Sequence, residues 1–155
     1  MISYATTVPT DWIDFNGHMR DGYYVLAVSY ANDATMEALG LGPAYLARTG
    51  ATLYNLENQI RFLREAHEGD PIRVEMWLVA ADRKRLHLAS VIRHSATGET
   101  LAENAAVLLH VQRGPEGPRA APFPAEVQAR VEAMLAEDAG APAPSFAGAV
   151  GLGPK

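Results

Sequence analysis

A loop ahead of an expected helix contains the side chains of this sequence best suited to chemistry. Asp14 supplies a carboxylate, which can attack a carbonyl carbon or take a proton from water. Asn16, Gly17 and His18 follow it, and a helical pattern begins at Asp21. Because the first backbone amides of a helix are unpaired donors, a helix start can hold a carbonyl oxygen as it becomes an oxyanion. These residue types are also common in plain turns, so a structural role is the alternative.

The pattern of apolar residues predicts the elements that position this loop. Tyr24, Val28, Ala31 and Thr35 recur at helical spacing and predict one long, well-buried helix. Later segments alternate between apolar and polar residues, which is typical of strands. The expected elements are a strand ending at residue 8, a helix over 21–39 that stops at the glycine- and proline-containing stretch 40–43, strands over 52–63, 72–78, 86–92 and 101–111, and a helix over 124–138.

Length and composition exclude several classes of protein. A chain of 155 residues without cysteine has no disulfide scaffold, thiolate metal site, iron–sulfur cluster or cysteine nucleophile. Its formal charge of −5 argues against nucleic-acid binding. No apolar run reaches the roughly 18 residues that span a membrane, and the N-terminus lacks the pattern of a secretory signal. We therefore expect a cytoplasmic protein that binds neither nucleic acid nor a membrane.

The same pattern predicts the domain organisation. Residues 1–138 are expected to form a single domain, followed by a Gly/Ala/Pro-rich C-terminal tail over 139–155. We expect this tail to be flexible; the alternative is that Phe146, Val150 and Leu152 hold it against the surface.

The order of the elements predicts the fold. A single long helix that is apolar over a wide arc needs a sheet wrapped around it, and such a sheet commonly covers its remaining edge or face by dimerising. Strand, long helix, four antiparallel strands and a terminal helix is the order of the α+β hotdog fold.

Two segments resemble acyl-CoA thioesterases of the 4-hydroxybenzoyl-CoA type, which are hotdog proteins. Asp14, the Gly17-His18 pair and Tyr24 match the spacing of their active-site signature, and residues 57–64 with the turn at 69–70 resemble their second strand. The resemblance implies an acyl-CoA substrate, with coenzyme A as part of the substrate and no other cofactor, and a homodimer or homotetramer. It implies Asp14 as nucleophile or general base.

The resemblance also implies roles for the neighbours of Asp14. Gly17 and His18 would hold the loop, and backbone amides around residues 21–23 would form the oxyanion site. The sequence departs from the family at Arg20 and Asp21, where two asparagines are frequent. An unpaired Asp21 would raise the pKa of Asp14 and weaken it as a nucleophile, whereas Arg20 could offset that charge or reach a phosphate.

A narrower resemblance, in residues 14–19, 53–58 and 84–87, is to the betainyl-CoA thioesterases of carnitine catabolism. A trimethylammonium acyl group would need aromatic faces and a carboxylate. Candidate faces are Trp12, Phe15, Tyr23, Tyr24, Tyr54, Phe62 and Trp77, with Glu57 for the charge, and ordinary core packing is the alternative for each aromatic residue.

The candidate site therefore has three parts. They are Asp14 as the catalytic group; Asn16, Gly17, His18, Asp21, Gly22, Tyr23 and Tyr24 in the active-site loop and oxyanion region; and Trp12, Tyr54, Glu57, Asn58 and Arg64 in substrate binding. The five histidines show no paired metal spacing, so no metal is expected. The alternative function is a hotdog module that binds acyl-CoA without cleaving it.

Overall fold

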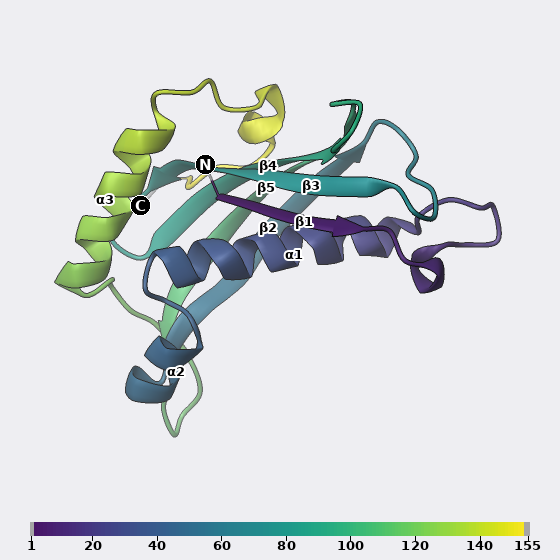
Figure 1. Cartoon of the computed structure of the whole chain (residues 1–155). Helices are drawn as coiled ribbons and strands as arrows, with labels where there is room; N and C mark the ends of the chain where they lie inside the picture. The colour runs from purple at the N-terminus through teal and green to yellow at the C-terminus, as the bar shows by residue number, and fades with distance from the viewer. Residues whose placement is uncertain (1, 154–155) are drawn as a thin grey trace.

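The computed structural model describes residues 2–153, and Figure 1 shows one curved sheet with a long helix lying along its concave face. The elements in chain order are β1 (Ile2–Thr7), the short 3-10 helix η1 (Thr10–Trp12), α1 (Asp21–Ala38), α2 (Pro43–Thr49), β2 (Ala51–Phe62), β3 (Pro71–Ala81), β4 (Arg85–His94), β5 (Thr100–Gln112), β6 (Arg119–Ala120), α3 (Ala125–Asp138) and the 3-10 helix η2 (Ser145–Ala149).

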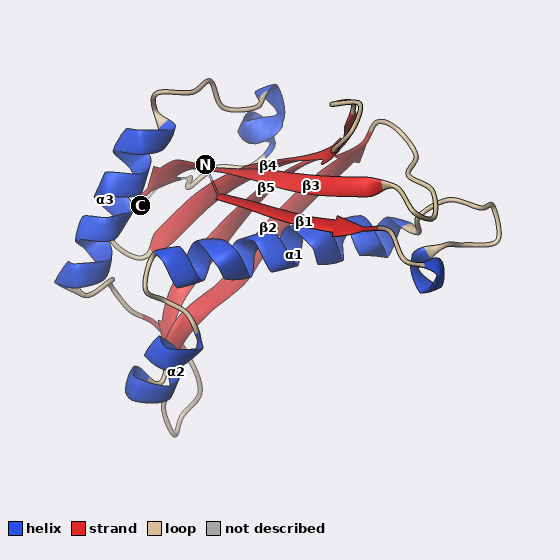
Figure 2. Cartoon of the chain, in the orientation of Figure 1, coloured by secondary structure: helices blue, strands red, loops and turns tan. Residues whose placement is uncertain are grey.

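The sheet has the strand order β1-β3-β4-β5-β2, with β6 paired to the end of β5, and every pairing is antiparallel (Figure 2). The strand that follows the helices in sequence, β2, therefore lies at an edge, beside β5 rather than beside β3. A register shift between Asn55 and Glu57 interrupts its pairing with β5. The α+β hotdog prediction is confirmed.

Small side chains let α1 lie close to the sheet. Ala27, Val28, Ala31 and Thr35 face the core and are at most 2% exposed. Opposite them, alternate residues of β3, β4 and β5 face the helix, because side chains alternate between the two faces of a strand. Most of these side chains are apolar, and Ser90 of β4 and Asn104 of β5 are buried polar exceptions. The wide apolar stripe of α1 is thus buried against the concave face.

The stretch 40–43 ends α1 as expected, but it does not lead directly into a strand. Pro43 begins α2, because proline suits the first turn of a helix, where no backbone N–H is needed. Gly50 ends this short helix in the left-handed conformation with φ 71°. The sequence prediction lacked α2, since seven residues are too few for a clear helical period.

The C-terminal segment returns to the convex face of the sheet. There Val150 packs with Ala105 and Val107 of β5, and Phe146 and Leu152 lie against the same cluster. Arg61 of β2 lies over the Phe146 ring, 4.8 Å from its centroid. The structure therefore follows the alternative in which apolar residues hold this segment against the surface. No helix within residues 2–153 is long and apolar enough to cross a membrane.

Candidate active site

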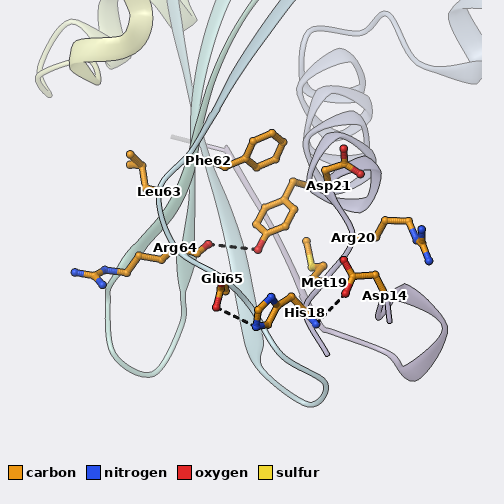
Figure 3. Close-up of a pocket in the computed structure, with 10 residues that line it drawn as sticks. Asp14, His18, Met19, Arg20, Asp21, Phe62, Leu63, Arg64 and Glu65 are labelled. Atoms are coloured by element: carbon orange, nitrogen blue, oxygen red, sulfur yellow. Dashed lines mark hydrogen bonds and ion pairs between the residues drawn. The ribbon is translucent and has the colours of Figure 1, made fainter. Parts of the chain in front are cut away.

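A pocket of about 480 Å³ opens between the start of α1 and the end of β2 (Figure 3). The hairpin before α1 contributes one wall, and the end of β2 with the segment that follows it contributes the other. Its lining residues are Asp14, His18, Met19, Arg20, Asp21, Tyr24, Phe62, Leu63, Arg64 and Glu65.

A tight hairpin holds the Asp14 carboxylate at this pocket. The Asp14 N–H donates to the His18 carbonyl at 2.9 Å, and the Gly17 N–H donates to the Asp14 carbonyl at 3.1 Å. Gly17 has a φ of 80°, a conformation that favours glycine. The Oδ1 atom of Asp14 accepts the N–H of Asn16 at 2.8 Å and that of His18 at 3.3 Å. Within residues 2–153, Oδ2 has no hydrogen-bond donor and is available for chemistry.

These contacts keep the Asp14 carboxyl ionised. Partial burial raises its pKa, but the backbone N–H groups of His18 and Asn16 and the charge of Arg20 outweigh that effect, so the pKa of Asp14 lies below its ordinary value. The expectation that Asp21 would raise the pKa of Asp14 is therefore not met, because the nearby donors and Arg20 favour the charged form. Asp14 is an anion at neutral pH.

The start of α1 presents one free backbone donor at the pocket. Arg20 N–H donates to the Trp12 carbonyl at 2.8 Å, and Tyr23 N–H donates to the Arg20 carbonyl at 3.0 Å. Gly22 N–H lies 2.9 Å from the Asp21 side chain. Within the part of the chain described here, the N–H of Asp21 has no partner, which leaves it able to donate to a substrate carbonyl.

Tyr24 joins the helix to the opposite wall. Its hydroxyl accepts the N–H of the fully buried Ala66 at 3.0 Å and donates to the Arg64 carbonyl at 3.4 Å, the bond dashed in Figure 3. The Phe62 ring stands nearly perpendicular to the Tyr24 ring, with centroids 5.4 Å apart. Burial raises the pKa of Tyr24, so the hydroxyl stays neutral and keeps both bonds.

Three of the six acidic or basic side chains of the pocket wall have an ion-pair contact. His18 Nε2 lies 3.0 Å from the Glu65 carboxylate, and Arg64 Nε lies 3.3 Å from that of Glu99. In Figure 3 the side chains of Arg20 and Arg64 extend away from each other on opposite sides of the pocket. His18, Glu65 and His67 place ligand-type atoms within 4.8 Å of one another, which is the one such group of three found in residues 2–153. The sequence prediction of no metal remains a prediction.

The structure brings five candidate residues from the sequence analysis to the pocket: Asp14, His18, Asp21, Tyr24 and Arg64. Asn16, Gly17 and Gly22 support the loop and the helix start through their backbones.

The other candidates lie outside the pocket lining. Trp12 and Tyr23 stack on each other, with centroids 5.0 Å apart. Tyr54 and Glu57 are exposed on β2, and the Asn58 side chain accepts a hydrogen bond of 2.7 Å from Asn104 on β5.

Sequence reasoning did not place Met19, Leu63 and Glu65 in the pocket, and it named Phe62 only as one aromatic candidate among several. The signal for three of them was present, because Phe62, Leu63 and Glu65 lie in or beside the segment that resembles the second strand of the thioesterases. Met19 lies in the segment 14–19 of the narrower resemblance, and its backbone N–H donates to the Ala66 carbonyl at 2.7 Å, which joins the two walls.

Comparisons with known proteins identify the family of the chain. Residues 8–131 match the family model of the thioesterase-like superfamily. The chain is 41% identical to a protein of Pseudomonas aeruginosa named betainyl-CoA thioesterase, with 99% of this chain and 96% of that protein covered. It is also 35% identical to an L-carnitine dehydrogenase/betainyl-CoA thioesterase of Ruegeria pomeroyi. That match covers 96% of this chain but 29% of the longer protein.

Among solved structures, a putative thioesterase of Pseudomonas putida superposes with a TM-score of 0.82 at 34% identity. That match covers 100% of this chain and 97% of the other. Matches of this extent in sequence and in structure settle the family. The chain belongs to the thioesterase-like superfamily and is a thioester hydrolase with the hotdog fold.

Proposed function

We propose that the protein hydrolyses a small acyl-CoA thioester at the pocket described above, with Asp14 as the group that acts. One observation carries this proposal. An ionised carboxylate with a free oxygen shares a pocket with the unpaired N–H of Asp21 at a helix start. The carboxylate supplies the base or nucleophile, and the N–H with the helix dipole stabilises negative charge on the thioester oxygen.

Two routes lead to the same products. As a general base, Asp14 takes a proton from water while the water oxygen bonds to the carbonyl carbon, and the C–S bond then breaks. As a nucleophile, Asp14 itself forms the new C–O bond and displaces the thiolate, and water hydrolyses the resulting anhydride. Either route consumes one water and releases a carboxylic acid and coenzyme A, whose thiolate takes up a proton.

For the acyl group we propose betaine. The support is the name of the relatives in Pseudomonas aeruginosa and Ruegeria pomeroyi, together with two aromatic rings, those of Tyr24 and Phe62, in the pocket wall. Aromatic faces attract quaternary ammonium groups. Arg20 and Arg64, at opposite sides of the same pocket, are the candidates to meet the phosphates of coenzyme A.

We propose that the protein acts as a cytoplasmic homodimer joined through β2. This strand lies at an edge of the sheet, so one side of its backbone is unpaired. Leu56 is 57% exposed and Leu63, just past its end, is 47% exposed. Exposed edge strands with apolar side chains commonly pair with another chain. Sedimentation velocity should give twice the chain mass, and Leu56→Glu should shift the protein towards a monomer; a monomeric wild type would contradict the assembly.

Thiol release from a panel of acyl-CoAs tests the activity. We expect turnover of betainyl-CoA, with acetyl-CoA and benzoyl-CoA as comparison substrates. If the wild type releases no thiol from any thioester yet is stabilised against heat by them, the protein is the non-catalytic binding module instead. Turnover of benzoyl-CoA alone would keep the hydrolase and reject betaine as the acyl group.

A further inference from the structure

Asp21 places a second carboxylate in the pocket wall. Its one hydrogen bond within residues 2–153 comes from the N–H of the next residue, Gly22, and no Lys, Arg or His side chain there forms an ion pair with it. Glu65 and Arg64 of the wall differ, because Glu65 pairs with His18 and Arg64 pairs with Glu99, whereas Asp14 and Arg20 also form no ion pair within residues 2–153. Asp21 is therefore an exposed anionic group of the pocket that forms no ion pair within residues 2–153.

The helix dipole explains why an acidic residue stands at the start of α1, but it does not explain why the carboxylate lies at the pocket. An acidic residue in the first turn of a helix is favoured by the helix dipole, and Asp21 is the first residue of α1. The dipole would favour an acidic residue in the first turn equally well on a face of α1 that points away from the pocket. Here the carboxylate shares a wall with Asp14, so the pocket holds two carboxylates on its α1 side (Figure 3). Arg20 is the one guanidinium on that side, so two carboxylates and one cation leave a net negative charge there, which favours a cationic ligand.

The covalent geometry of betaine places its charge in this same pocket. In a betainyl thioester one methylene separates the nitrogen from the carbonyl carbon, which corresponds to about 2.5 Å by the standard N–C–C dimensions of the backbone. When the carbonyl carbon lies beside Asp14, the trimethylammonium group must lie within the pocket too. The rings of Tyr24 and Phe62 stand there nearly perpendicular to each other, with centroids 5.4 Å apart.

We infer that Asp21 is a specificity-determining residue that selects an acyl group with a quaternary ammonium next to the carbonyl, with the rings of Tyr24 and Phe62 as its apolar partners. The carboxylate supplies the countercharge, and the aromatic faces contact the methyl groups. The inference rests on the proposed hydrolysis of acyl-CoA at this pocket. It adds which residue distinguishes a cationic acyl group from a neutral one of the same shape.

A pair of isosteric substrates tests this directly. In 3,3-dimethylbutanoyl-CoA a tert-butyl group replaces the trimethylammonium group of betainyl-CoA, so that shape is kept and charge is removed. For the wild type we expect kcat/KM to favour betainyl-CoA by at least tenfold. In Asp21→Asn we expect this ratio to fall at least tenfold, about 1.4 kcal/mol, mainly through a higher KM for betainyl-CoA.

Asp11→Asn is the matched control. Asp11 is an exposed carboxylate in η1 outside the pocket lining, and its substitution should leave the substrate ratio unchanged. Phe62→Leu should lower the ratio through loss of the aromatic face, in the same direction as Asp21→Asn. An unchanged ratio in Asp21→Asn, or an equal loss with both substrates, would overturn the inference.

The outcomes separate this inference from the proposed function. If the wild type hydrolyses both thioesters with equal kcat/KM, the hydrolase stands and the role of Asp21 is wrong. If the wild type hydrolyses neither, the proposed function fails. Calorimetry then measures the binding of the two thioesters to the wild type and to Asp21→Asn. Tighter binding of betainyl-CoA by the wild type that is lost in the variant supports the role of Asp21 in specificity. Equal affinities of the wild type for the two thioesters overturn it.

Discussion

The Tyr24 hydroxyl is predicted to stabilise the fold and the pocket together. Tyr24→Phe removes the acceptor of the Ala66 N–H, which lies 3.0 Å from it and is fully buried. A buried donor left without a partner costs about 1–3 kcal/mol. For a domain of this size 1 kcal/mol corresponds to roughly 2–4 °C in melting temperature, so we expect a decrease of about 2–12 °C. The Arg64 carbonyl also loses its 3.4 Å partner, but Arg64 is exposed, so water can replace that bond.

Tyr45→Phe provides the matched control. The Tyr45 hydroxyl is also buried and lies 3.0 Å from Nε2 of His110, and neither residue lines the active-site pocket. Urea unfolding should show a loss of about 1–3 kcal/mol in both variants. Thiol release should fall only in Tyr24→Phe, because Arg64 and Glu65 beside Ala66 line the pocket. The reasoning is refuted if Tyr24→Phe keeps the unfolding free energy of the wild type, or if both variants lose activity equally.

Three further predictions concern charge and metal. Because backbone donors and Arg20 outweigh burial and hold the pKa of Asp14 below its ordinary value, kcat/KM should stay level from about pH 8 to about pH 5; a loss with an apparent pKa near 6 in a pH-rate profile would contradict this. Glu75 accepts hydrogen bonds from Arg73 and Arg93 at 2.8 and 2.9 Å, and although burial raises its pKa, these partners bring the pKa below its ordinary value. The stabilisation is therefore present at neutral pH and lost as the pH falls through the lowered pKa, so Glu75→Gln should cost about 1–2 kcal/mol at pH 7. In urea unfolding that difference should narrow towards pH 3, and a constant difference would refute the assignment. Dialysis against EDTA should leave thiol release unchanged, since the proposed chemistry needs only a carboxylate and backbone N–H groups; activity that is lost and then restored by zinc would show a role for the His18–Glu65–His67 group.

The sequence predicted the fold well where local pattern and packing agree. The helical stripe of Tyr24, Val28 and Ala31 and the alternation in β3, β4 and β5 both reflect burial against one core, so periodicity alone locates them. The short helix α2 and the shift between Asn55 and Glu57 were not predicted, because a few residues define no period and a bulge depends on the partner strand.

The sequence indicated the pocket wall before α1 more clearly than the opposite wall at the end of β2. The loop from Asp14 to Asp21 is continuous in sequence, so its motif could be recognised directly. The opposite wall depends on the tertiary fold, because β2 lies beside α1 only once the sheet has curled. Glu57 was expected to supply the charge for a cationic substrate, but it lies outside the pocket lining, whereas the carboxylates of Asp14 and Asp21 lie within it.

The rate of thiol release by Asp14→Asn tests the central claim most directly. The substitution keeps the size of the side chain and removes the anion, and Asp11→Asn makes the same change outside the pocket. With betainyl-CoA, or with the best substrate of the panel, we predict that Asp14→Asn lowers kcat by roughly 10²–10⁴-fold while its melting temperature stays close to that of the wild type. Asp11→Asn should keep full activity. A folded Asp14→Asn variant that turns over at nearly the wild-type rate would contradict the assignment of Asp14 as the group that acts.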